Sequence, residues 1–175
     1  EALNTVSVDV TTRLGDEDAD AAGAIIVAKD ATLTATNNVI KSPDPLNNID
    51  GDAGGLASGA QASSDIILDL ATVVDIDNYT QITTTNGKGA LKAKAFNAID
   101  ITDDVALFTA GAVSGAGSFV DLVTNQLLAS VDVGIGAQVN ANGELVMEAN
   151  GLFVVDLHSK SETYGIGTVA VGHAR

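Results

Sequence analysis

The favoured metal-binding segment of this sequence lies between residues 44 and 52, and a weaker calcium candidate is the acidic run of Asp16, Glu17, Asp18 and Asp20. Calcium binds several oxygen atoms, which carboxylates, amides and backbone carbonyls provide. The segment has suitable residue types, but it lacks the correctly spaced first acid of a calcium loop and its distal glutamate. The alternative is an ordinary turn rich in Asp and Asn. The candidate calcium ligands are Asp44, Asn48, Asp50 and Asp52.

Other side chains that could do chemistry do not form a recognisable set. The chain has no Cys, so only His158 and His173 could join carboxylates around zinc. Ser159 and Ser161 lie near His158 in sequence, without the elbow motif of a serine hydrolase. The glycine-rich tract 111–118 lacks the lysine of a phosphate-binding loop. We therefore expect no enzyme, and no cofactor other than calcium.

The formal charge of −15 limits the partners. Nucleic-acid binding needs clustered Lys and Arg to neutralise phosphates, so this surface argues against it. Lys92 and Lys94 alternate on one face of a predicted strand, where acids on adjacent strands could pair with them. No apolar run approaches the roughly 18 residues of a membrane span. Asn78-Tyr79-Thr80 is an N-glycan acceptor triplet, relevant only to a chain exported through a glycosylating system.

Three stretches of the chain share one order of features at a regular spacing, roughly 55 residues apart. Short alternating runs end at Ala35, Ala95 and Ala149, and each is followed by a second strand-like segment and a tract of small residues. Units repeated at a fixed period usually bury their apolar faces against one another. The sequence therefore predicts a single array over residues 1–175, with repeats at approximately 1–64, 65–117 and 118–175.

Composition and turn signals predict an all-β fold, specifically a parallel β-solenoid (β-helix). β-Branched residues alternate with polar ones, aromatic residues make up only 3%, and 18 Gly punctuate the chain. We expect two or three solenoid turns per repeat, each of about 20 to 25 residues. Small-residue tracts should lie where the coil turns sharply or where opposing faces come close. The alternative is an antiparallel β-sandwich. The expected corners are at Asp65, Asp69, Asp75, Asp77 and Asp103-Asp104.

The repeats resemble those of large bacterial exoproteins, in particular filamentous-haemagglutinin-like and leukotoxin-type adhesins. The matching elements are the segments 90–95, 98–102, 111–123, 139–149, 153–158 and 165–172. The resemblance implies a β-solenoid stalk or fibre outside the cell, with roles in adhesion, aggregation or matrix building. It supplies no catalytic residues.

We therefore expect a structural or adhesive extracellular or cell-surface protein, a solenoid segment of a filament, stalk or sheath. Its open ends should pair with further copies of the chain, because unpaired strand edges are templates for another strand. A second expected partner is cell-surface or matrix polysaccharide. The alternatives are a carbohydrate-active β-helix enzyme and a calcium-dependent binding module. Because the chain begins at Glu1 without Met, we expect a processed product or a segment of a longer protein.

Overall fold

The protein is seen in a computed structural model that describes residues 1–15, 23–42, 49–85 and 87–175. Within those ranges it is all-β, with eleven strands and no helix.

We name three successive passages around the molecule the first, second and third circuits. The first contains β1 (Ala2–Leu14), β2 (Ile25–Ala28), β3 (Ala31–Lys41) and β4 (Ile49–Gly54). The second contains β5 (Ala57–Ile76), β6 (Gln81–Thr84) and β7 (Leu91–Ala110). The third contains β8 (Val113–Val133), β9 (Gln138–Asn140) and β10 (Leu145–Tyr164), and β11 (Gly167–Ala174) begins a fourth.

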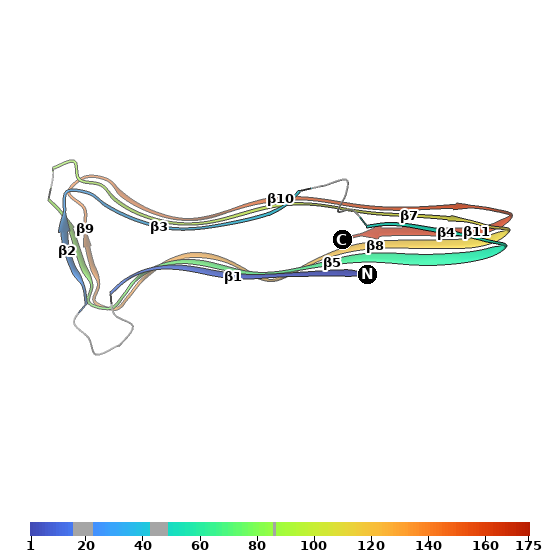
Figure 1. Ribbon diagram of the computed structural model, residues 1–175. Helices are drawn as coiled ribbons and strands as arrows, with labels where there is room; N and C mark the ends of the chain where they lie inside the picture. Colours follow the sequence, from blue (N-terminus) through green and yellow to red (C-terminus); the bar gives the residue numbers. More distant parts are fainter. Residues whose placement is uncertain (16–22, 43–48, 86) are drawn as a thin grey trace.

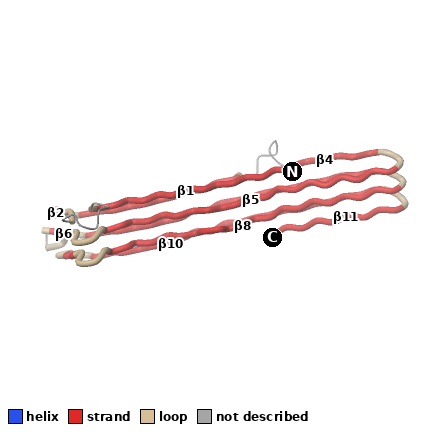
Figure 2. Tube along the Cα trace, turned by 90° about the horizontal axis from the view of Figure 1, so that it is seen from below, coloured by secondary structure: helices blue, strands red, loops and turns tan. Residues whose placement is uncertain are grey.

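The strands form two long sheets and one short sheet, as Figure 1 shows. One long sheet has the order β1-β5-β8-β11, and the other has the order β10-β7-β3 with β4 also paired to β7. The short sheet β2-β6-β9 closes one end of the molecule, and sharp turns close the other (Figures 1 and 2). All pairings among the described strands are parallel, which excludes the antiparallel sandwich for this part of the chain.

The register aligns the stretches that look alike in sequence. Ala35 lies opposite Ala95, and Ala95 lies opposite Ala149. Ala57 lies opposite Val113, at the start of the next small-residue tract. Each circuit is therefore one full sequence period long, and the expectation of two or three shorter turns per repeat is wrong.

The long circuits arise because most of the expected corners do not exist. Asp65, Asp69 and Asp75 lie inside β5, where they alternate with buried residues and point outward. Asp103 and Asp104 also lie inside β7, where Asp104 points outward and Asp103 is buried on the inward face. Asp at every second position reaches solvent from a straight strand, so most of the acidity that suggested corners belongs to the outer surface, with Asp103 the exception among these residues.

The core lies between the two long sheets and is most completely buried in the second circuit. Leu70, Val74 and Leu91 are fully buried there, since a strand covers them on both sides. In the third circuit, Phe153 is 48% exposed, although its partner Ile99 in the second circuit is 1% exposed. A strand at the edge of the stack thus leaves its inward side chains half uncovered.

The small-residue tracts lie at the sharp turns and along a narrow end of the core, as predicted. A Cβ at Gly165 would overlap the carbonyl oxygen of Gly111. A Cβ at Gly111 would in turn overlap the carbonyl oxygen of Gly55. Beside the turns the sheets approach closely enough for hydroxyl contacts: Ser118 Oγ lies 2.8 Å from Ser159 Oγ and 2.9 Å from Ser161 Oγ. Small residues are needed because larger side chains would force the sheets apart.

Candidate functional site

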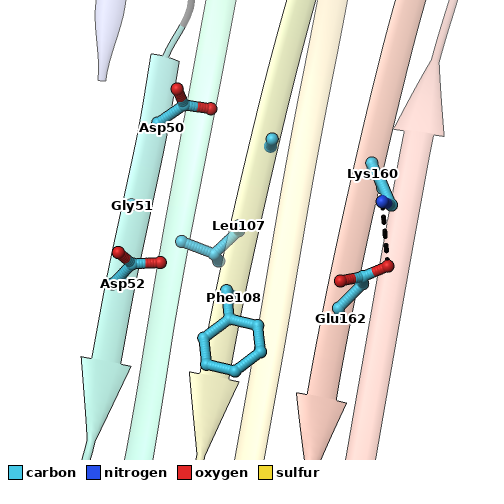
Figure 3. A pocket seen from close by; sticks show the side chains of 8 residues that line it. Asp50, Gly51, Asp52, Leu107, Phe108, Lys160 and Glu162 are labelled. Carbon is cyan, nitrogen blue, oxygen red and sulfur yellow. Dashed lines mark ion pairs between the residues drawn. The ribbon is translucent and has the colours of Figure 1, made fainter.

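A hollow of about 300 Å³ lies on the outer face of the β10-β7-β3 sheet, where β4, β7 and β10 run side by side (Figure 3). Its outward side chains stand in two columns across the three strands. One column contains Asp50, Ala106 and Lys160, and the other contains Asp52, Phe108 and Glu162. Since Ala106 is small and stands between longer side chains, the surface is depressed above it. We call this feature the outer hollow.

The outer hollow contains both charge and an aromatic surface. Lys160 Nζ lies 2.8 Å from Glu162 Oε1. Glu162 accepts a hydrogen bond from Lys160 and attracts its charge, which raises the pKa of the lysine above its usual value. The Phe108 ring lies next to that of Tyr164, with centroids 5.4 Å apart, and both rings are exposed. The carboxylates can accept hydrogen bonds from sugar hydroxyls, and the exposed aromatic rings can pack against the apolar face of a sugar ring.

Two of the four predicted calcium ligands lie in the outer hollow. Asp50 and Asp52 are both exposed on the outer face of β4. Asp44 and Asn48 lie outside the described residues, as does the acidic run from Asp16 to Asp20. The described residues contain no group of three or more His, Cys, Asp or Glu placed to hold a metal ion. Calcium binding therefore stays a prediction.

The histidines and serines near the C-terminal end are not brought together as a nucleophilic set. His158 Nε2 lies 2.9 Å from Asp156 Oδ1, and both side chains are exposed. Ser159 points to the other face of β10, where its hydroxyl donates to the Ser118 carbonyl and accepts from the His173 amide. Neighbouring residues on a strand face opposite ways, so His158 does not face Ser159.

The predicted pairing of the lysines on residues 91–95 is confirmed. Lys94 Nζ lies 2.7 Å from Glu148, its partner on β10, and Lys92 Nζ lies 3.3 Å from Glu144. These side chains are about half exposed, so each pair contributes about 0–1 kcal/mol to stability.

The two open surfaces of the stack form a second candidate site. One surface is the free side of the first circuit, with β1 and β3 at its sheet edges, and the other is the free side of the third circuit, with β10 and the uncovered part of β8. Both expose apolar side chains, including Ile40 at 60% and Val154 at 49%. We name these the first-circuit surface and the third-circuit surface.

Sequence reasoning did not find four residues of the outer hollow and its aromatic pair: Phe108, Lys160, Glu162 and Tyr164. They are separated from Asp50 and Asp52 by one or two periods of the sequence, and none belongs to a motif. The spacing that aligns Ala95 with Ala149 also aligns Ala106 with Lys160 and Phe108 with Glu162. The spacing from Ala35 to Ala95 does not align Asp50 with Ala106, because the register of β4 differs from that of β3.

These observations define an all-β protein built from parallel sheets. No protein family, curated protein or solved structure matches the chain. Across the described parts of the chain, no helix has the length and apolar character needed to cross a bilayer.

Proposed function

We propose that this chain is a parallel β-solenoid segment of three repeats that associates end to end and forms part of an extracellular filament, stalk or sheath. In this proposal it acts as a scaffold in adhesion or matrix formation and is not an enzyme. The proposal is supported by parallel register between residues one period apart, which allows circuits to be added without changing the cross-section.

The observation that carries the proposal is the incomplete burial at both open surfaces. β10 pairs only with β7 among the described strands, and its inward Phe153 and Val155 are 48% and 43% exposed. Their partners Ile99 and Ile101 in β7 are 1% exposed. An added circuit would pair the free backbone groups and bury these side chains, as β10 does for β7.

The experiment is electron microscopy and light scattering of the purified chain across a concentration series. We expect filaments for the wild type and dispersed, folded monomers for Phe153→Lys, since a charge would be buried in the joint. The control is Val146→Lys, which changes an outward side chain of the same strand. Dispersed wild-type monomers at high concentration, or equal assembly of Phe153→Lys, would contradict the proposal.

A second candidate function is polysaccharide binding at the outer hollow, favoured by the exposed ring pair beside Asp52 and Glu162. Affinity electrophoresis in gels containing polysaccharides tests it. Phe108→Ala should remove the retardation, and Phe119→Ala, on the outer face of the other long sheet, should retain it.

Turnover of a polysaccharide that is lost in Asp52→Asn would instead support the carbohydrate-active enzyme. Calorimetric calcium binding that is lost in Asp50→Asn would support the calcium-dependent module.

A further inference from the structure

We infer that the third-circuit surface binds the first-circuit surface of a second copy, head to tail, in the same register that relates successive circuits within one chain. The inference rests on the proposed end-to-end association and specifies its partner, polarity and register. In this joint β10 pairs with β3 and β4 of the second copy, and the uncovered part of β8 pairs with its β1.

The two surfaces have complementary steps. β1 pairs with residues 64–76 of β5 and leaves residues 57–63 uncovered on that side. β11 pairs with residues 113–120 of β8, Arg175 extends this pairing to Asp121, and residues 122–133 have no strand beside them on the other side. The register runs from Ala2 to Ser64, Val120 and Ala174, so β11 ends at the position in the circuit where β1 begins. In this register Ala174 of one copy and Ala2 of the next would take the same place opposite Val120, so residues 173–175 and 1–3 must move apart at the joint. Residues 4–14 of the second copy then fill the rest of the step on β8.

Opposite charges meet at two columns of this joint. Arg13 and Asp75 are adjacent in one column and are joined by a 2.9 Å ion pair, and Asp132 follows on the third circuit. Adding a copy places its Arg13 between its own Asp75 and the first copy's Asp132. In the second column, Lys160 of one copy lies beside Asp50 of the next.

One column of the joint places like charges together. Glu162 of one copy lies beside Asp52 of the next. The Lys160 ammonium, 2.8 Å from Glu162, adjoins this column and reduces the repulsion. The joint therefore has two favourable columns and one unfavourable column that is partly neutralised.

The apolar side chains also match across the joint. The outward column Ile40-Asp100-Val154 is charged in the middle circuit and apolar at both surfaces. Stacking places the exposed Val154 directly beside the exposed Ile40 of the second copy. Inside the core, Asn37 has a buried Nδ2 without a hydrogen-bond partner, and Gly151 of the adjoining copy presents no side chain against it. Both matches depend on the same register.

Cysteine cross-linking tests the register, because the chain has no Cys of its own. In an Ile40→Cys/Val154→Cys variant the two thiols of one copy are two strand spacings apart, about 9.6 Å, which is too far for a disulfide. Across the joint they are one spacing apart, about 4.8 Å, which permits one. We expect mild oxidation to give a ladder of covalent oligomers. The control Ile40→Cys/Val146→Cys has its second thiol further along the same outward face of β10 and should give none.

The single variants determine polarity. Neither Ile40→Cys nor Val154→Cys should form a disulfide alone, and a mixture should form heterodimers. Dimers from either single variant would indicate a symmetric contact and overturn the inference. Filaments by electron microscopy without the expected ladder would overturn the register and leave the proposed function standing. Absence of both filaments and ladder would overturn both.

Charge exchange gives an independent readout. Lys160→Glu and Asp50→Lys should each assemble less well than wild type, because like charges then meet in the joint. A mixture of the two variants should assemble again, because every joint between unlike copies brings opposite charges together. One kind of joint pairs the new Glu at position 160 with the new Lys at position 50, and the other pairs Lys160 with Asp50. The chain carrying both substitutions should also recover. Equal assembly of all four samples would overturn the assigned column.

Discussion

At the residue scale, the sharp turns require glycine because successive turns stack directly on one another. The missing Cβ of Gly111 leaves room for the Gly55 carbonyl, and the missing Cβ of Gly165 leaves room for the Gly111 carbonyl. The glycines therefore allow the backbones of successive turns to lie close together. Glycine is required because the residue that it contacts lies in the neighbouring circuit, a full sequence period away.

We predict that Gly111→Ala destabilises the protein by about 1–3 kcal/mol, because the methyl group must displace backbone. Gly87→Ala is the control, since a Cβ there has nothing within 4 Å. It should be neutral or stabilising by up to about 1 kcal/mol. Urea denaturation followed by circular dichroism measures both, and equal stability of the two variants would contradict the stacking explanation.

In the described part of the chain, one ion pair reaches into the core. Asp103 is 2% exposed on the inward face of β7, and its carboxylate accepts a hydrogen bond from Lys41. Its partner in the third circuit is Leu157. An acidic residue is tolerated at this core position because the lysine of the first circuit neutralises it.

Lys41→Met should therefore cost about 1–3 kcal/mol, since it leaves a buried carboxylate without its cation. The Lys41 side chain is 32% exposed, so the loss should fall short of that for a fully buried pair. Lys41→Met/Asp103→Leu should recover most of the loss, because Leu already occupies the same column at Leu157. A double-mutant cycle in urea checks the coupling, and purely additive effects would refute it.

At the element scale, the distance between the two long sheets changes along their length. Near the turns, Ser118, Ser159 and Ser161 bridge the sheets through hydroxyl groups, whereas Leu70 and Ile99 fill the core further along. A strand can thus be Gly-, Ala- and Ser-rich at one end and aliphatic at the other because the gap that it borders changes.

Ser118→Val should destabilise by about 1–3 kcal/mol, because it leaves hydroxyl partners unsatisfied and adds a methyl group to a narrow space. Ser130→Val, on the outer face of the same strand, is the matched control and should change stability by less than about 0.5 kcal/mol. Thermal unfolding curves measure the difference. A smaller loss for Ser118→Val than for Ser130→Val would show that the sheets are not closely apposed there.

At the scale of the whole molecule, strand spacing fixes the thickness of the stack. Three circuits at about 4.8 Å each give about 14 Å along the stacking direction, less than two or three shorter turns per repeat would have given. The long dimension lies instead along the strands (Figure 2).

A filament built by the proposed joint should therefore show an axial rise of about 14 Å per copy, with a strand repeat of about 4.8 Å. Cryo-electron microscopy with helical reconstruction measures both. A rise of two or of four strand spacings per copy would mean that the copies do not add three complete circuits each.

The sequence by itself determined the periodicity, the strands and the placement of small residues at turns. Ala35, Ala95 and Ala149 could be aligned by eye, because stacked circuits place similar residues in similar surroundings. The tertiary structure decided how long each circuit is, since an Asp at an outward strand position and an Asp at a corner look alike in sequence. It also decided which distant residues share a column, such as Asp50 with Lys160, because that depends on the exact register between strands a full period apart.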